Sequence, residues 1–243
     1  MEQKNSGISI ILPALNEAQN IEELSKEIMH YFERRGIPYE IIIVNDGSTD
    51  QTGEIAERLS MTYKNISVIH HSKNRGYGKS LRDGFEASKY DYLFFTDADR
   101  QFRIDSLDTF LPLMNEGNAD MIIGYRIDRQ DTFRRKIFAW CFNRMIHVLF
   151  SIDYKDIDCA FKLFKRDVFK SLEIISNDFL FNTELLAKAQ ITQCNIVQLG
   201  VPHYPRAHGK STISYKSILL TLRMLFPLYR EIKNFKKRMV LKT

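Results

Sequence analysis

Five short apolar segments recur along the first half of the chain, spaced roughly 30 residues apart, which is the length of a strand–helix–strand unit. They are residues 8–12, 40–44, 66–69, 92–95 and 121–123. Amphipathic helical patterns lie between several of them. Short, nearly all-apolar strands joined by helices are typical of a sheet that is covered on both faces. The spacing therefore predicts an α/β fold with a mostly parallel sheet flanked by helices.

The clearest helical pattern follows Asn20. Its apolar residues, spaced for one side of a helix, are Ile21, Leu24, Ile28 and Phe32. Asn20 followed three residues later by Glu23 predicts a capping box at the start of the helix. Gly36 is the residue expected to end it.

Distinctive polar segments follow four of the predicted strands. They are residues 13–17, 45–50, 74–79 and 97–99. In open parallel sheets ligands bind beyond the carboxyl ends of the strands, which lie along one edge. Four such segments at one edge predict a nucleotide site there.

Asp97 and Asp99 are separated by a single residue at a strand end. Two carboxylates so close repel each other, and neither is buried cheaply without a cation. Mg²⁺ or Mn²⁺ prefers such hard oxygen ligands and keeps coordination positions open for phosphate oxygens. The pair therefore predicts a metal site that stabilises a departing diphosphate, the alternative being a solvated turn.

Other polar residues at the same edge suit a nucleotide diphosphate. Asp46 can accept hydrogen bonds from a base or from a ribose hydroxyl, although a turn-forming role is the alternative. Glu17 has either a similar role or one in starting the first helix. Arg126 and Arg206 can each clamp a diphosphate with paired hydrogen bonds, unless they form surface salt bridges.

Several other function classes are disfavoured by spacing. Two segments resemble the end of a P-loop, but the required glycine positions hold Lys73 and Tyr204. The glycines at 76, 78 and 84 miss the spacing of a dinucleotide-binding loop. The three cysteines, Cys141, Cys159 and Cys194, are far apart and odd in number, which argues against disulfides or zinc and favours a reducing compartment.

The chain carries two apolar helical patterns and a basic tail. Residues 134–151 have a broad apolar face, which suits either a core helix or a helix lying in a membrane interface, and residues 218–229 lead into the tail. Residues 223–243 contain seven basic side chains and one acidic one, within a net charge of +5. Because no run of about 18 apolar residues and no signal peptide is present, we expect peripheral contact with the cytoplasmic face of a membrane. A solvated basic helix is the alternative, and no nucleic-acid-binding motif is present.

The ordered motifs resemble those of family-2 glycosyltransferases. They are Pro13-x-x-Asn16-Glu17, residues 44–50 (VNDGSTD), Asp97-Ala98-Asp99, and Arg206 with Gly209 and Ser211. Within that family the chain is most similar to the dolichol-phosphate mannose synthase and polyprenyl-phosphate glycosyltransferase branch. The resemblance covers residues 7–212 and implies a GT-A fold, a divalent metal and inversion at the sugar carbon.

The resemblance also implies roles for individual residues. Those around the nucleotide sugar are Pro13, Leu15, Glu17, Val44, Asp46, Asp97, Ala98, Asp99, Arg126, Arg206 and Lys210. The implied metal ligands are Asp97, Asp99 and Gln101. Residues 156–162 (DIDCAFK) resemble the acceptor-side motif, in which either Asp156 or Asp158 is the equivalent carboxylate. Two positions depart from the branch: Thr212 replaces its usual lysine, and Leu15 its tyrosine.

The resulting expectation is a GT-A glycosyltransferase domain over residues 1–212 and an amphipathic, basic helical tail over 213–243. The enzyme would move a hexose from a GDP- or UDP-linked donor to a polyprenyl or dolichyl phosphate. Arg126, with Arg134 or Arg135, would hold the acceptor phosphate, and Asp158 would orient it or serve as a base. The basic tail is also compatible with a homo-oligomer or with binding to a membrane-anchored partner protein. The alternatives are transfer to a sugar hydroxyl of a cell-surface glycan, a nucleotidyltransferase, and a non-catalytic nucleotide-sugar-binding module.

Overall fold

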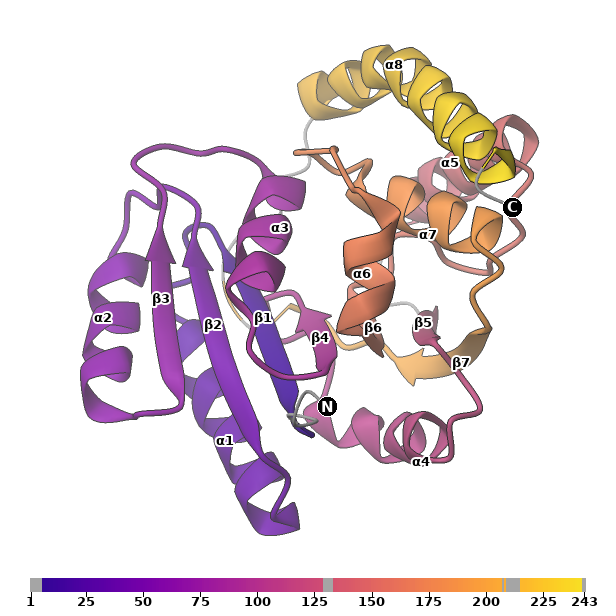
Figure 1. The fold of residues 1–243 in the computed structure, drawn as a ribbon. Helices are drawn as coiled ribbons and strands as arrows, with labels where there is room; N and C mark the ends of the chain where they lie inside the picture. Colours follow the sequence, from indigo (N-terminus) through magenta and orange to yellow (C-terminus); the bar gives the residue numbers. More distant parts are fainter. Residues whose placement is uncertain (1–5, 129–132, 207, 209–214, 242–243) are drawn as a thin grey trace.

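The protein, seen in a computed structural model that describes residues 6–128, 133–206, 208 and 215–241, is built around one mixed sheet. Seven strands pair in the order β3-β2-β1-β4-β6-β5-β7. The strands are β1 (Ile8–Ala14), β2 (Tyr39–Asn45), β3 (Ile66–His70), β4 (Tyr92–Thr96), β5 (Met121–Ile127), β6 (Phe161–Lys165) and β7 (Ile196–Pro202). Helices lie on both faces of this sheet (Figure 1), as the α/β prediction requires.

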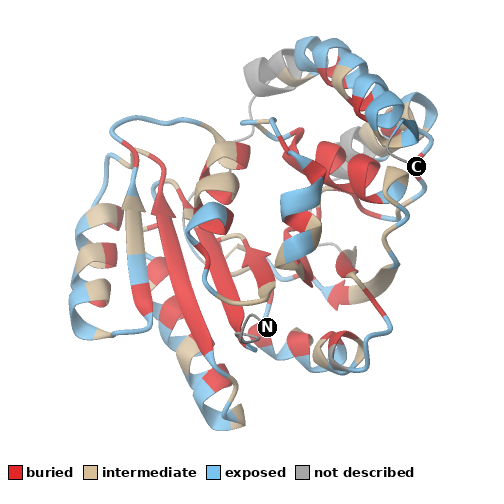
Figure 2. Ribbon diagram, in the orientation of Figure 1, coloured by how far each residue is buried: buried red, intermediate tan, exposed pale blue. Residues whose placement is uncertain are grey.

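The helices alternate with the strands in the first half and cluster in the second. They are α1 (Ile21–Arg35), α2 (Thr52–Thr62), α3 (Tyr77–Ala87), the 3₁₀ helix η1 (Ile104–Thr109), α4 (Leu111–Asn115), α5 (Phe133–Phe150), α6 (Arg166–Leu172), α7 (Phe181–Ile191) and α8 (Tyr215–Val240). The five strands predicted from the apolar segments are all confirmed, each extended by one to four residues. β1 and β2 are the most deeply buried of these strands (Figure 2), because they are covered on both faces, whereas β3 at the end of the sheet is mostly half-buried or exposed.

Two strands were not predicted, and one of them determines how the site is assembled. β6 runs antiparallel to both β4 and β5, while β5 and β7 are parallel. The amino end of β6 therefore lies at the same edge as the carboxyl ends of β1, β2, β4, β5 and β7. This reversal brings residues 156–160, which precede β6, to the edge that carries the polar loops.

The first helix begins and ends where the sequence predicts, but the capping box is wrong. Asn20 is the N-cap residue of α1, yet its side chain makes no capping hydrogen bond. The Asn20 side-chain amide instead donates to Glu17 Oε2 at 2.6 Å. Asn20 therefore positions a carboxylate of the polar edge and does not cap the helix. Gly36 ends α1 in the left-handed region, at φ 63°, as expected.

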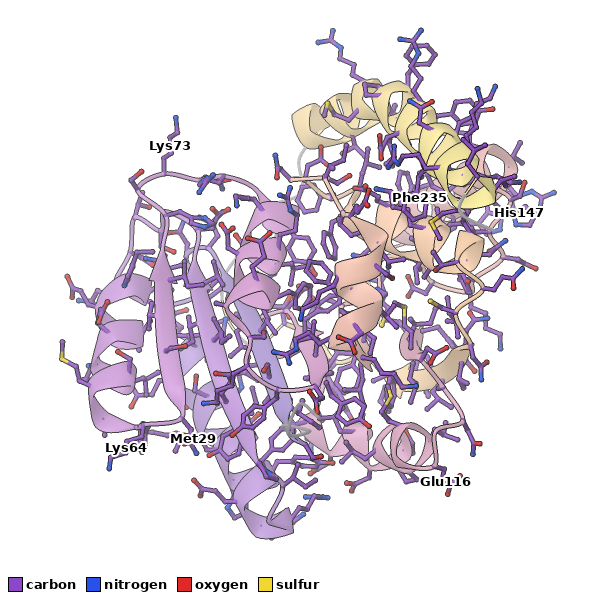
Figure 3. The ribbon with its side chains drawn as sticks, in the orientation of Figure 1. Met29, Lys64, Lys73, Glu116, His147 and Phe235 are labelled. Carbon is purple, nitrogen blue, oxygen red and sulfur yellow. The ribbon has the colours of Figure 1, made fainter. Side chains whose placement is uncertain are left out.

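The last helix packs across α7 (Figure 1). Its inner face contributes Leu225, Leu228, Ile232 and Phe235 to the buried residues, and Phe235 lies where α8 meets α7 (Figure 3). Its outer face is exposed and includes Phe226, which is 60% exposed. Within the described ranges, none of the helices combines the length and apolar character that crossing a bilayer requires.

The helix over residues 133–150 is only partly a core helix. Ile146 is fully buried, whereas Trp140 and Val148 are each 68% exposed. The described part of this helix is therefore not a fully buried core helix, and its contact with a membrane interface stays a prediction.

Candidate active site

The two predicted metal carboxylates follow β4 at the polar edge. Asp99 is buried, at 4% exposed, and Asp97 is partly buried. Burial and the neighbouring charge of Asp99 raise the pKa of Asp97 to about 7, against smaller opposing effects of Tyr77, Arg126 and Arg206. Burial and like charge both disfavour ionisation of this pair, and a bound cation would relieve both effects.

Arg206 is the direct counter-ion of this edge. Its guanidinium donates to Asp99 Oδ2 and to Glu17 Oε1, both at 2.9 Å. Arg206 follows β7, the last strand, whereas Glu17 follows β1, the first strand. The Arg206 side chain therefore links the segments that follow the first and last strands of the sheet. Burial raises the pKa of Glu17, although Asn20 and Arg206 oppose the shift.

The residues present fit a hard divalent cation. Asp97 and Asp99 supply carboxylate oxygens, and the backbone N–H of Gln101 donates to Asp99 Oδ1 at 3.2 Å, which orients that carboxylate. The Gln101 side-chain amide donates to the Tyr204 carbonyl at 3.1 Å, so this predicted ligand also ties the β4 loop to the segment after β7. Within the described residues, no cluster of three or more His, Cys, Asp or Glu side chains could hold a metal. A metal held here would therefore take further ligands from substrate or water.

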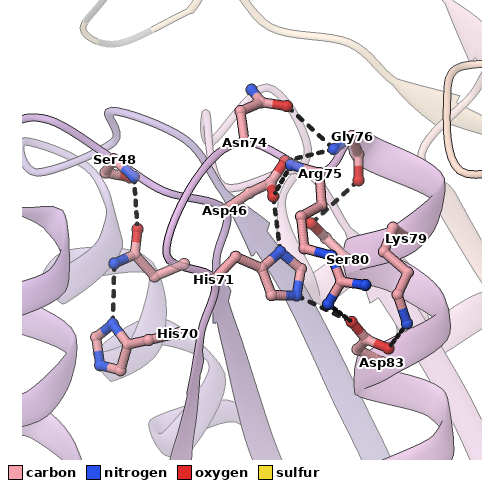
Figure 4. A network of polar contacts seen from close by, with 11 residues as sticks. Asp46, Ser48, His70, His71, Asn74, Arg75, Gly76, Lys79, Ser80 and Asp83 are labelled. Carbon is pink, nitrogen blue, oxygen red and sulfur yellow. Dashed lines mark hydrogen bonds and ion pairs between the residues drawn. The ribbon is translucent and has the colours of Figure 1, made fainter.

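Asp46 lies at the end of β2 and holds the glycine loop that precedes α3 (Figure 4). Its Oδ1 accepts from the Arg75 N–H at 2.7 Å and its Oδ2 from the Gly76 N–H at 3.0 Å. His71, almost fully buried, bridges Asp46 at 2.7 Å and Asp83 at 2.9 Å through its two ring nitrogens. In this structure Asp46 shapes the loop; its predicted contact with a base or ribose stays a prediction.

The other predicted nucleotide residues differ in accessibility. Pro13 and Leu15, at the end of β1, are partly exposed at the edge. Val44 is fully buried on β2, opposite Pro13 in the strand register, so its side chain packs inside the protein. Ala98 is also buried, between the two carboxylates. Lys210 lies outside the described residues.

The structure separates the two candidate carboxylates of the acceptor-side motif. Asp156 is buried and accepts a paired salt bridge from Arg126, at 2.6 Å from Nε and 2.8 Å from Nη2. Burial alone lowers the pKa of Arg126, but the hydrogen bonds and charge of Asp156 outweigh it and raise that pKa. Asp158 is only partly buried, and its charge contributes to the raised pKa of Tyr77 at the start of α3. Asp158 is thus the more accessible carboxylate of the two.

Lys162 holds the segment that carries Asp158. It is fully buried on β6, and its ammonium donates to the carbonyl of Ile157 at 3.1 Å, to the carbonyl of Cys159, and to Asn182 Oδ1 at 3.1 Å. A buried ammonium with three acceptors is satisfied without a carboxylate partner. The turn before β6 is therefore built around this cation.

The predicted acceptor-phosphate residues Arg134 and Arg135 belong to the first turn of α5, and their side chains lie outside the described part of the structure. Sequence reasoning missed Tyr77, His71 and the positional role of Lys162. Tyr77 begins α3 directly after the glycine loop, and His71 directly follows β3. Only the alternation of charge and bulk in residues 161–165 (FKLFK) hints at a strand with an inward-pointing lysine.

Comparisons with known proteins agree with this arrangement. The model of "Glycosyl transferase family 2" matches residues 9–173. The chain is 28% identical over 234 residues to the dolichol-phosphate mannosyltransferase of Pyrococcus furiosus, covering 92% of this chain and 64% of that protein. It is 28% identical over 211 residues to the dolichyl-phosphate beta-glucosyltransferase ALG5D of Trichomonas vaginalis, covering 80% of this chain and 64% of that one.

Among solved structures, the chain resembles glucosyl-3-phosphoglycerate synthase from Mycobacterium tuberculosis in complex with Mn²⁺ and UDP-glucose. The TM-score is 0.71 at 16% identity, covering 93% of this chain and 79% of that one. At this identity the likeness shows the fold, which is the GT-A fold expected from the sequence. The chain spans slightly less than two thirds of the length of the two curated relatives.

Proposed function

This chain belongs to glycosyl transferase family 2, and we propose that it is an inverting, metal-dependent enzyme that transfers a hexose from a nucleotide-diphosphate sugar to a polyprenyl or dolichyl phosphate. The observation that carries the proposal is the carboxylate pair Asp97 and Asp99, with Arg206 beside it, at the carboxyl edge of the sheet. The two relatives named for dolichyl-phosphate transfer support the acceptor class.

The donor's diphosphate is the group that this edge suits. Asp97 and Asp99, with Gln101, would hold Mg²⁺ or Mn²⁺, which supplies a Lewis acid for the charge on the leaving diphosphate. Arg206 contributes a second positive group, because its guanidinium already lies 2.9 Å from Asp99 and can reach oxygen atoms at the same place. Glu17 keeps Arg206 at the edge through its own 2.9 Å bond.

A lipid phosphate needs positioning rather than deprotonation. Its oxygen is already anionic at neutral pH, so no general base has to remove a proton before attack. Asp158, partly buried and close to the carboxylate edge, is the residue we assign to orienting the acceptor. We assign the acceptor phosphate to Arg126, with Arg134 or Arg135 of the first turn of α5.

A substitution of Asp158 tests this assignment against the hydroxyl-acceptor alternative. With a polyprenyl phosphate acceptor, Asp158→Asn should lower kcat by less than about tenfold, because only orientation is changed. With a hydroxyl acceptor that needs a base, the loss should be about 10²–10⁴-fold. If Asp158→Asn lowers kcat by the larger factor, the acceptor group is a sugar hydroxyl of a glycan and the lipid-phosphate proposal is wrong.

The most general test is a panel of nucleotide sugars. GDP- and UDP-linked hexoses are incubated with Mn²⁺ or Mg²⁺, with and without polyprenyl phosphate, and nucleoside diphosphate release is measured. We expect release that requires the metal and rises with the lipid phosphate. Metal-independent release, or no response to lipid phosphate with any donor, would contradict the proposal.

We also propose that α8 rests on the cytoplasmic face of a membrane. Its exposed side carries aromatic, cationic and amide side chains, namely Phe226, Tyr229, Arg230, Lys233, Asn234 and Lys237. Exposed aromatic groups beside cations suit the interface of an anionic leaflet.

Vesicle flotation tests the membrane proposal without deleting α8, whose inner face is part of the core. Lys233→Glu with Lys237→Glu should abolish flotation on vesicles that contain anionic lipid. A matched control, Lys64→Glu with Lys73→Glu, changes the same charge at exposed sites on the other half of the molecule (Figure 3) and should float normally. Equal flotation of both double variants would refute a membrane role for α8.

A further inference from the structure

Asp46, directly after β2, has fewer free acceptor positions than a carboxylate normally offers (Figure 4). An ionised carboxylate has about four such positions, two on each oxygen. Asp46 Oδ1 accepts from the Arg75 N–H at 2.7 Å and lies 2.7 Å from His71 Nδ1, and Oδ2 accepts from the Gly76 N–H at 3.0 Å. Among the described residues, these three groups use both positions of Oδ1 and leave one position on Oδ2.

His71 is the side chain that takes the second position on Oδ1. Its side chain is 3% exposed, and its two ring nitrogens lie 2.7 Å from Asp46 and 2.9 Å from Asp83. Because an ionised carboxylate can only accept, both nitrogens must donate, which makes the ring a cation between two acids. Lys79 pairs with the other oxygen of Asp83 and so favours the ionised form of that acid. His71 is therefore held in place by charge on both sides.

The backbone donors to Asp46 are also fixed. Gly76 has φ +98°, and a Cβ atom there would lie 2.2 Å from the Asn177 carbonyl oxygen, so the loop is pressed against that residue. The Lys79 N–H donates to the same carbonyl at 3.1 Å. The Gly76 N–H is shared with Asn74 Oδ1 at 3.0 Å, which makes Oδ2 the less occupied oxygen of Asp46.

One free acceptor position distinguishes between the bases of nucleotide sugars. Uracil has a single N–H group on its pairing edge, which needs one acceptor. Guanine has a ring N–H beside a 2-amino group, and the two pair with both oxygens of a carboxylate. The Asp46 side chain is only 6% exposed, so a guanine placed against it would bury a donor whose acceptor is already used. Leaving a buried donor unsatisfied weakens binding.

We propose that Asp46 selects a base with a single N–H on its pairing edge, which makes the sugar donor UDP-linked rather than GDP-linked, and that His71 is the positioning residue that closes the second position on Oδ1. This inference rests on the proposed function, in which Asp46 contacts the base of a nucleotide-sugar donor. It narrows that proposal from two nucleotides to one.

The test is calorimetric titration of the unaltered protein with UDP, GDP and IDP in the presence of Mn²⁺. IDP is GDP without the 2-amino group, so it keeps the size of a purine but has the single N–H. We expect UDP to bind about tenfold more tightly than GDP, which is the effect of one buried donor left unsatisfied. IDP should bind at least as tightly as GDP, whereas a site built for guanine would prefer GDP to IDP.

Two histidine variants test the role of His71. His71→Leu removes a donor from Oδ1, so the carboxylate is no longer fully occupied and most of the preference for UDP over GDP should be lost. A purely structural effect would weaken both nucleotides equally and leave their ratio unchanged. His70→Leu is the matched control, because the neighbouring His70 contacts Asn45 and Glu57 rather than Asp46, and it should keep the ratio.

The outcomes separate this inference from the proposed function. If GDP binds the unaltered protein as tightly as UDP, or more tightly than IDP, the base selection is refuted and the nucleotide-sugar proposal survives. This comparison needs no variant, so it decides the question even if His71→Leu does not fold. A UDP preference that folded His71→Leu retains in full would refute the role of His71. If none of the three nucleotides binds with Mn²⁺, the proposed function fails together with the inference.

Discussion

Replacing Lys162 by methionine removes the buried cation around which the turn before β6 is built. The side chain is fully buried, and methionine has a similar length but donates no hydrogen bond. The change leaves the carbonyls of Ile157 and Cys159 and the amide oxygen of Asn182 without their donor. These acceptors hold the segment that carries Asp158.

The size of the effect follows from two opposing contributions. Each buried acceptor left unsatisfied costs about 1–3 kcal/mol, so three cost roughly 3–9 kcal/mol. Removal of the ammonium offsets several kcal/mol, because burial disfavours the charge and already lowers the pKa of Lys162. We expect a net loss of about 3 kcal/mol, which lowers the melting temperature of a chain this size by about 6–12 °C.

Urea unfolding and calorimetry measure the stability change, and steady-state kinetics measure its functional consequence. Lys162→Met should raise KM for polyprenyl phosphate more than KM for the donor, since the acceptor-side turn is loosened. The control is Lys165→Met on the same strand, whose partly exposed ion pair with Asp120 at 2.7 Å is worth only about 0–1 kcal/mol. Equal losses for the two variants, or an unchanged acceptor KM in Lys162→Met, would refute this reasoning.

Two further predictions concern the glycine loop and its supporting network. Gly76→Ala should sharply weaken nucleotide binding measured by calorimetry, because a Cβ atom there would lie 2.2 Å from the Asn177 carbonyl oxygen at φ +98°. Gly117→Ala, at φ +72° with nothing within 4 Å, should cost stability only and leave binding intact. Burial raises the pKa of Asp83, but hydrogen bonds from Lys79 and His71 outweigh it and lower that pKa. The stability that Asp83 contributes should be present above its unfolded pKa of about 3.9 and be lost as pH falls through the lower folded value. Urea unfolding of Asp83→Asn from pH 7 to pH 3 should therefore show a deficit that shrinks on acidification; a constant deficit would contradict the network.

The first half of the fold was predictable because β1 and β2 are buried on both faces and their sequences are nearly continuous apolar runs. β6 and β7 were not, for different reasons. β6 places a charged residue, Lys162, at a fully buried position, which breaks the apolar signal. β7 is mostly half-buried, so its sequence shows only a weak preference for a strand.

The parts of the site formed by residues close together in the sequence were predictable. The contacts between distant segments, which depend on the order of the strands, were not. Asp97 and Asp99 lie two positions apart, so their repulsion can be inferred from the sequence alone. The pairing of Arg126 with Asp156 and the bond from Arg206 to Asp99 depend on where the sheet places β6 and β7. No local pattern encodes those contacts.

The central claim is that Asp97 and Asp99 share one divalent cation beside the donor's diphosphate. Crystals grown with Mn²⁺ and the nucleoside diphosphate that the donor panel selects would test it through the anomalous scattering of manganese. We predict one strong anomalous peak in contact with oxygens of Asp97, of Asp99 and of the diphosphate. A bound diphosphate with no peak between these carboxylates, or a manganese ion held elsewhere, would contradict the account.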